Sequence, residues 1–154
     1  MRHLSRSPAE TFDLGAALGK QVLPGALLLL FGELGAGKTA FIKGFVQGVL
    51  GDSSLVTSPT FTYLNIYKAA DSDQQRIVYH FDLYRLGGIE EFLSMGFDEF
   101  LDAGGFSCIE WADKLGNLPL PGAIHVRIEP LEGDMRSISM DLMDLDKMDK
   151  HGHD

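Results

Sequence analysis

The segment that most constrains this chain is Gly32-Glu33-Leu34-Gly35-Ala36-Gly37-Lys38-Thr39, which fits the pattern G-x-x-x-x-G-K-T. In such a loop, glycines leave backbone N–H groups free to surround phosphate oxygens, and the start of a helix adds partial positive charge. The pattern is specific when a strand precedes it and a helix follows it. Residues 26–31 form a short apolar run, and Phe41, Phe45 and Val49 recur at helical spacing. The sequence therefore predicts a strand, a phosphate-binding loop and a helix, and not a glycine-rich turn that matches by chance.

The loop also predicts which atoms meet the ligand. Lys38 is expected to reach the β- and γ-phosphates of a nucleotide, and the Thr39 hydroxyl is expected to bind Mg²⁺. The chain contains no Asn-Lys-x-Asp tetrapeptide, the usual device for reading guanine, so ATP with Mg²⁺ is the favoured ligand. The predicted nucleotide contacts in this region are Glu33, Leu34, Gly35, Ala36, Gly37, Lys38, Thr39 and Ala40.

Composition narrows the remaining classes of function. A chain of 154 residues has the usual size of one domain, and we expect a folded domain over 1–140 and a disordered acidic tail over 141–154. The net charge of −9 argues against tight direct binding to nucleic acid, which needs clustered Lys and Arg. The longest apolar run is too short to span a bilayer, and the first residues lack the core of a signal peptide, so we expect a cytoplasmic protein. The single cysteine, Cys108, lies in an apolar run and is expected to be a buried, inert thiol.

Helices and strands alternate along the chain. A capping box at Ser7 and Glu10 predicts a helix from Pro8 to Gln21, and its expected apolar face consists of Phe12, Leu14, Leu18 and Val22. Apolar runs at 61–67 and 76–81 predict a hairpin, which would add antiparallel strands to an otherwise parallel sheet. Further expected elements are helical segments at 88–92 and 98–101 and strands at 106–109, 123–129 and 136–142. This order predicts an α/β protein, a three-layer P-loop NTPase with a mixed, mainly parallel central sheet.

Two acids stand where a hydrolytic site would need them. Hydrolysis requires carboxylates that hold Mg²⁺ and orient water, and these normally lie at strand ends near the loop. Asp82 follows the apolar run 77–81, and Glu110 follows the run 106–109. Thr60, in the segment Ser58-Pro59-Thr60-Phe61, lies where nucleotide switches place a threonine, although a simple proline turn is the alternative. Trp111 is predicted either to pack beside the nucleotide or to fill the core.

These motifs, in this order, resemble the TsaE (YjeE) family. The resemblance covers about residues 7–136 and is carried by GELGAGKT, by SPTF, by His80-Phe81-Asp82-Leu83-Tyr84-Arg85-Leu86 and by Glu110-Trp111. It implies a cytoplasmic ATPase that joins TsaB and TsaD, so that tRNA is contacted only indirectly. Its ATP turnover would support threonylcarbamoyl modification of adenosine 37 in tRNA.

The resemblance also implies residue roles. Lys38 would be the phosphate lysine, Thr39, Asp82 and Glu110 the Mg²⁺ and acidic site residues, and Thr60 the switch threonine. The adenine would lie near Ser7 and Thr11, and either Gly133 or Arg136 would make the contact near the C-terminal end.

Two other functions remain open at this point. A small-molecule kinase on the same scaffold would need an acceptor pocket and usually an arginine-rich lid, yet only Arg76 and Arg85 lie between the loop and Glu110. A nucleotide-dependent binding module with negligible turnover would differ from an ATPase only in rate. Because no convincing arginine finger is present, although Arg85 is an internal candidate, we expect an ATPase that is slow alone and faster with its partners.

Overall fold

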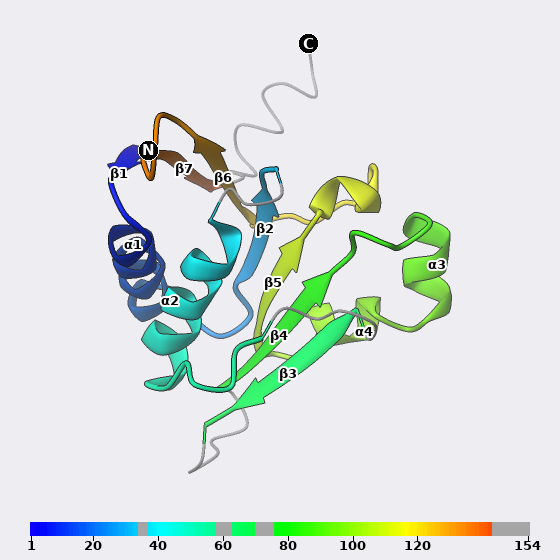
Figure 1. The fold of residues 1–154 in the computed structure, drawn as a ribbon. Helices are drawn as coiled ribbons and strands as arrows, with labels where there is room; N and C mark the ends of the chain where they lie inside the picture. The colour runs from blue at the N-terminus through cyan, green and yellow to red at the C-terminus, as the bar shows by residue number, and fades with distance from the viewer. Residues whose placement is uncertain (34–36, 58–62, 70–75, 143–154) are drawn as a thin grey trace.

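The computed structural model describes residues 1–33, 37–57, 63–69 and 76–142. Seven strands form one sheet in the order β1-β7-β6-β2-β5-β4-β3 (Figure 1). The strands are β1 (Arg2–Ser5), β2 (Leu27–Phe31), β3 (Leu64–Lys68), β4 (Ile77–Asp82), β5 (Phe106–Glu110), β6 (Ile124–Pro130) and β7 (Arg136–Leu142). The helices are α1 (Pro8–Gln21), α2 (Lys38–Leu50), α3 (Ile89–Ser94), α4 (Asp98–Leu101) and the 3₁₀ helix η1 (Ala112–Leu115).

The sheet is parallel at its centre and antiparallel at its edges. Strands β6, β2, β5 and β4 run parallel to one another, whereas β3 pairs antiparallel with β4, and β7 pairs antiparallel with both β6 and β1. The predicted hairpin corresponds to β3 and β4. Strands β2, β4 and β5 carry apolar side chains on both faces, as strands covered on both sides require. Strand β6 is apolar on the α2 side only and carries His125, Arg127 and Glu129 on the other.

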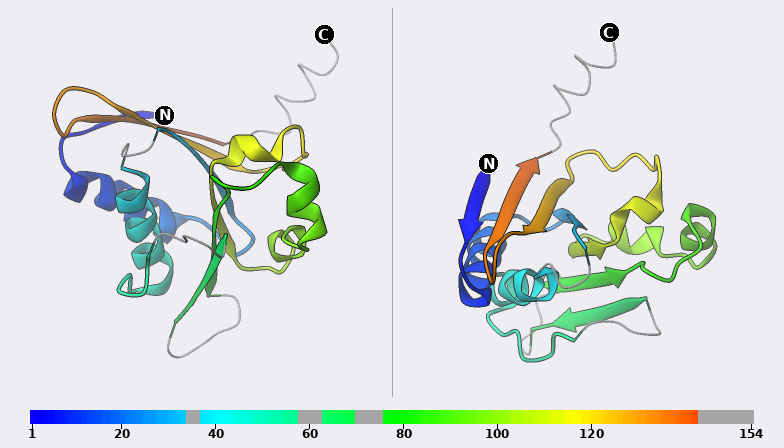
Figure 2. Two further views of the ribbon diagram at one scale, coloured as in Figure 1. Left: turned by 45° about the vertical axis from the view of Figure 1, so that its right-hand side comes forward. Right: turned by 45° about the horizontal axis from the view of Figure 1, so that its top comes forward.

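Helices cover both faces of the sheet centre, which gives three layers (Figure 2). Alternating residues of β2 point to opposite sides, so Leu28 and Leu30 face α2 while Leu29 faces α3, α4 and η1. The core under α2 includes Phe41, Phe45, Val126 and Ile128; the other core includes Phe81, Phe92, Phe97 and Ile109. The predicted fold class, an α/β P-loop architecture with a mixed sheet, is confirmed.

Helices α1 and α2 approach each other through glycines. The buried residues of α1 are Thr11, Gly15 and Gly19, and a Cβ at Gly15 would overlap the carbonyl oxygen of Phe41. A Cβ at Gly44 of α2 would in turn overlap the carbonyl oxygen of Phe12. Three residues of the predicted apolar face of α1, Leu14, Leu18 and Val22, pack against the core under α2, as expected. Phe12 is half-buried. The prediction did not include the fully buried positions, where the backbones of the two helices meet.

The first strand is absent from the sequence prediction. Residues Arg2–Ser5 form β1, which pairs with β7 in a register that sets Ser5 opposite Arg136. Strand β7 reaches Leu142, two residues beyond the expected domain boundary, and residues 143–154 lie outside the described part of the chain.

Among the described residues, no helix has the length and apolarity needed to cross a membrane.

Candidate nucleotide-binding site

The candidate site lies at the carboxyl ends of the parallel strands. Gly32 directly follows β2, Asp82 ends β4, and Glu110 ends β5. Asp82 and Glu110 are partners in the β4–β5 register, and Glu110 is also the partner of Leu30 in β2. Ligands of open α/β sheets bind at this edge. The structure thus brings together the loop and the two acids that the sequence identified.

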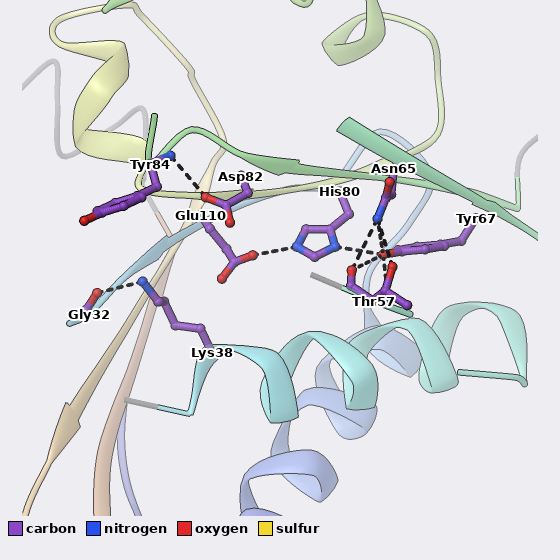
Figure 3. A network of polar contacts seen from close by, with 9 residues as sticks. All are labelled: Gly32, Lys38, Thr57, Asn65, Tyr67, His80, Asp82, Tyr84 and Glu110. Atoms are coloured by element: carbon purple, nitrogen blue, oxygen red, sulfur yellow. Dashed lines mark hydrogen bonds and ion pairs between the residues drawn. The ribbon is translucent and has the colours of Figure 1, made fainter. Parts of the chain in front are cut away.

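Lys38 reaches this edge as the first residue of α2. Gly37 caps the helix at φ 103°, a left-handed conformation that glycine adopts without strain. The Lys38 side chain is only 6% exposed, and its Nζ donates a hydrogen bond of 2.8 Å to the Gly32 carbonyl oxygen (Figure 3). The same Nζ lies 4.2 Å from the centroid of the Trp111 ring, within cation–π range. The lysine is therefore held over the loop by backbone and ring contacts.

Burial perturbs the charged groups of the site. Desolvation lowers the pKa of Lys38, although the nearby charges of Glu110, Asp82 and Asp113 raise it in part. Desolvation raises the pKa of Asp82, and the neighbouring Glu110 carboxylate raises it further. A hydrogen bond of 3.1 Å from the Tyr84 backbone N–H to Asp82 Oδ1 acts in the opposite direction. A cation bound between the adjacent strand ends would favour the charged form of Asp82.

The donor set fits Mg²⁺. Within the described ranges, no three His, Cys, Asp or Glu side chains gather into a closed metal site. Mg²⁺ keeps several waters and is usually held by one or two carboxylates together with substrate phosphates. Asp82 and Glu110, with the Thr39 hydroxyl at the start of α2, could supply such ligands.

A polar chain behind Glu110 is absent from the sequence prediction. The His80 Nε2–H donates to Glu110 Oε2 at 2.7 Å, and His80 Nδ1 lies 3.0 Å from the Tyr67 hydroxyl. Both residues lie inside apolar runs, and although His80 belongs to the motif that carries the family resemblance, the sequence assigns neither residue a role in the site. The signal that could have identified His80 is strand alternation, since residue 80 shares the sheet face of Asp82.

Trp111 lies beside the loop, next to Lys38, and it also packs partly against the second core. Its backbone has φ 58°, a left-handed conformation that is uncommon outside glycine and costs energy. The Tyr84 ring lies 4.9 Å from the Trp111 ring. A cavity of about 800 Å³ borders this tryptophan and is lined by Gly32 and Glu33 on one side and by residues of β6 on the other. The first two residues of the loop, Gly32 and Glu33, therefore border an open cavity on the side of Trp111.

The β6–β7 hairpin brings a cation to the loop. The Arg136 Nε lies 3.9 Å from where a Cβ on Gly37 would stand, although the two residues are far apart in sequence. One Arg136 Nη1–H donates to the Gly133 carbonyl oxygen at 3.0 Å. The Arg136 side chain therefore borders the phosphate loop, and the choice between it and the Gly133 backbone for the nucleotide contact stays a prediction.

The N-terminal residues serve local structure. The Ser7 hydroxyl accepts from the Glu10 backbone N–H at 3.1 Å and caps α1. Thr11 is 1% exposed, and its hydroxyl lies 2.7 Å from that of Ser5. The adenine contact of Ser7 and Thr11 stays a prediction from resemblance.

Other predicted residues fall into three groups. Leu34, Gly35, Ala36 and Thr60 lie outside the described residues. Glu33, Thr39 and Arg85 are exposed, and Ala40 is half-buried on α2. Cys108 is fully buried, and burial raises the pKa of its thiol, which confirms the buried thiol and supports its expected inertness.

Comparison with known proteins shows to which family the chain belongs. The family model described as "Threonylcarbamoyl adenosine biosynthesis protein TsaE" matches residues 5–138. A Bacillus subtilis protein named tRNA threonylcarbamoyladenosine biosynthesis protein TsaE is 40% identical over 133 residues, covering 86% of this chain and 80% of the relative. Proteins of the same name from Treponema pallidum (38% identical, covering 91% of this chain and 99% of the relative) and Rickettsia conorii (37% identical, covering 90% and 76%) are also similar. The crystal structure of Bacillus subtilis YdiB superposes with a TM-score of 0.74 at 26% identity, covering 99% of this chain and 95% of that one. The chain therefore belongs to the TsaE family.

Proposed function

We propose that this protein binds and hydrolyses Mg²⁺–ATP and that its turnover supports threonylcarbamoyl modification of adenosine 37 in tRNA. It would act in the cytoplasm with TsaB and TsaD, and tRNA would be contacted through the complex. One observation carries the catalytic part of this proposal: Lys38, at the start of α2, lies close to Asp82 and Glu110 at the carboxyl ends of β4 and β5. Family membership carries the part that concerns tRNA.

The chain's own residues have distinct roles in this proposal. Lys38 would exchange its bond to the Gly32 carbonyl for phosphate oxygens, which compensate its buried charge better than a neutral carbonyl does. Glu110 and Thr39 would hold the metal, which when bound neutralises phosphate charge. Asp82 stands beside Glu110 and would orient the attacking water. Arg136, beside Gly37, would meet phosphate or sugar from the other side of the loop.

The site is open where a partner could complete it. Arg85 is exposed in the turn after β4, and the Arg136 Nη1 is engaged by the carbonyl oxygens of Gly133 and Met135. The cavity beside Trp111 gives access to Gly32 and Glu33 at the start of the loop. A charge-stabilising group supplied in trans is worth about 10³–10⁵ in rate where such groups operate. We therefore expect slow hydrolysis by the isolated chain and acceleration by TsaB and TsaD.

The test measures ATP hydrolysis and Mg²⁺-dependent nucleotide binding with and without a TsaB–TsaD pair. Trp111 is the only tryptophan in the chain and lies beside Lys38, so its fluorescence reports binding directly. Glu110→Gln should weaken Mg²⁺-dependent binding, whereas Asp82→Asn should spare binding and lower the rate. Lys43→Ala, an exposed lysine on α2, is the matched control and should behave as wild type. Equal rates with and without the partners would overturn the partner-completed mechanism.

The product distribution separates the alternatives. Stoichiometric release of phosphate identifies hydrolysis, whereas transfer of phosphate to a small molecule placed in the cavity beside Trp111 would identify a kinase. Tight binding without turnover, even with both partners present, would identify a nucleotide-dependent binding module.

A further inference from the structure

A row of hydrogen bonds runs from the acidic edge of the sheet to the chain after α2 (Figure 3). It begins with the bond of 2.7 Å from His80 to Glu110 and continues from His80 Nδ1 to the Tyr67 hydroxyl at 3.0 Å. The Tyr67 hydroxyl in turn donates to the Thr57 carbonyl oxygen at 2.9 Å. Asn65 adds a side-chain N–H within 3.3 Å of the same carbonyl. The row therefore connects the neighbouring strands β5, β4 and β3 with the chain after α2.

The row is buried where it meets the site. Tyr67 is 4% exposed, His80 2% and Glu110 6%, so water has little access to their polar atoms. Burial raises the pKa of Tyr67, which keeps its hydroxyl proton available for donation. A buried polar group that loses its partner pays a full desolvation cost, so these bonds are strongly maintained. Each member thus restricts the position of the next.

The row fixes one oxygen of Glu110 and leaves the other for a ligand. His80 holds Oε2, and Figure 3 shows the second carboxylate oxygen on the side of Lys38. Groups that hydrogen-bond a metal ligand from behind orient it, and their loss typically weakens metal binding about 10- to 100-fold. Without His80, the Glu110 carboxylate could rotate toward the Lys38 ammonium. The two groups already interact, because the charge of Glu110 acts to raise the pKa of Lys38.

We infer that His80 and Tyr67 are positioning residues that hold the Glu110 carboxylate ready for Mg²⁺ and connect it to the backbone at Thr57. Thr57 directly precedes residues 58–62, which contain the predicted switch residue Thr60. The binding of Mg²⁺–nucleotide at Glu110 and the hydrogen bonds of the Thr57 backbone then become coupled. This inference rests on the proposed Mg²⁺–ATP function. A purely structural role, in which the row only satisfies buried polar atoms of the core, predicts no such coupling.

The first experiment removes one hydroxyl. Tyr67→Phe keeps the ring and deletes the bonds to His80 and Thr57, and Tyr79→Phe is the matched control because Tyr79 is also buried and belongs to the opposite face of the sheet. We expect Tyr67→Phe to raise the Mg²⁺ concentration for half-maximal nucleotide binding about tenfold, by Trp111 fluorescence, with binding in the absence of Mg²⁺ unchanged. Tyr79→Phe should leave both values as in wild type.

A second set of variants tests whether His80 and Tyr67 act on Mg²⁺ binding through the Glu110 carboxylate. His80→Gln retains an N–H donor that can reach Glu110 and should recover much of the Mg²⁺ affinity that His80→Ala loses. In a Glu110→Gln background, Tyr67→Phe should have no further effect on Mg²⁺ dependence, since the carboxylate that it positions is gone. If Tyr67→Phe reduces the Mg²⁺ affinity by the same factor in wild type and in the Glu110→Gln background, Tyr67 contributes only to general stability and the inference is overturned.

Hydrogen exchange tests the coupling to Thr57. In wild type, Mg²⁺–nucleotide should slow exchange of the Thr57 backbone N–H, which donates to the Tyr67 hydroxyl, and this protection should be reduced in Tyr67→Phe. Wild type that shows no Mg²⁺-dependent nucleotide binding would refute the proposed function itself. Wild type that binds normally, beside a Tyr67→Phe variant with unchanged Mg²⁺ dependence and protection, would refute only the positioning role.

Discussion

Replacing Gly44 by alanine should destabilise the protein, although alanine is the better helix former. Gly44 lies in the middle of α2, where exchange for alanine normally adds about 1 kcal/mol of helix stability. Here a Cβ would lie 2.7 Å from the carbonyl carbon of Phe12 and 3.0 Å from the amide nitrogen of Ala16. These atoms belong to the backbone of α1 and cannot turn aside as a side chain does. The two helices would have to separate by roughly 1 Å to restore ordinary contact distances.

The expected loss follows from two opposing effects. Overpacking a well-packed interface costs about 1–3 kcal/mol, and contact with backbone places this site at the upper end. Subtracting the gain of about 1 kcal/mol in helix propensity leaves a net loss of about 2 kcal/mol. For a chain of this length, that loss corresponds to a Tm lowered by about 4–8 °C. Lys38 begins the same helix, so nucleotide affinity should fall as well.

Thermal unfolding followed by circular dichroism measures the effect. Ala17→Gly, at an exposed position of α1, is the control, because it changes helix propensity alone and should lower the free energy of unfolding by about 1 kcal/mol. If Gly44→Ala matches or exceeds the wild-type Tm, the close approach of α1 and α2 does not determine stability and the reasoning is refuted.

Two further predictions concern the site. Lys38→Ala should lose about 1.5–3 kcal/mol of nucleotide binding free energy, or about 10- to 150-fold in Kd, while keeping the wild-type far-ultraviolet spectrum; near-normal hydrolysis by this folded variant would refute the site. Asp82→Asn should raise the Tm of the nucleotide-free protein. The raised pKa of Asp82 means that folding disfavours its charged form, so this penalty is absent below the unfolded pKa and grows as pH rises through the folded pKa. The Tm difference between Asp82→Asn and wild type should therefore be larger near pH 7 than near pH 4, and a constant difference would contradict the assignment.

The elements that could be predicted are those whose signals are local. Helix α1 begins and ends as the capping box and the following Pro24-Gly25 indicate, and β2 and α2 flank the loop as the motif requires. Strand β1 has no such signal, since its four residues have no strong apolar alternation and gain their conformation from pairing with β7, more than 130 residues away. The apolar residues of α1 that pack against the core could be predicted, but its glycine contact with α2 could not, because glycine has no side chain and adds nothing to an apolar pattern.

The same distinction applies to the site. Asp82 and Glu110 interrupt apolar runs and could be identified as candidate ligands from the sequence alone. His80 and Tyr67 could not, because an isolated polar residue within a strand is more often a satisfied core residue than part of a site. Their contact depends on the antiparallel pairing of β3 with β4, which sets Tyr67 opposite Val78 and brings its hydroxyl within 3.0 Å of His80. Arg136 meets the loop only because β6 pairs with β2.

The two sides of the site are positioned by different physical means. Lys38 depends on a helix whose place is fixed by backbone contact with α1, a rigid arrangement that a ligand can shift only at a large cost in packing. Glu110 depends on a row of hydrogen bonds whose buried members keep their partners, but the row ends at an exposed residue, Thr57, whose bonds can be exchanged for bonds to water at small net cost. Nucleotide binding should therefore leave α2 in place and be felt first along the row from Glu110 to Thr57. In the proposed mechanism, Lys38 and α2 would keep the same position with and without nucleotide. The row from Glu110 would then be the part of the site whose hydrogen bonds change at Thr57 when the metal and nucleotide bind.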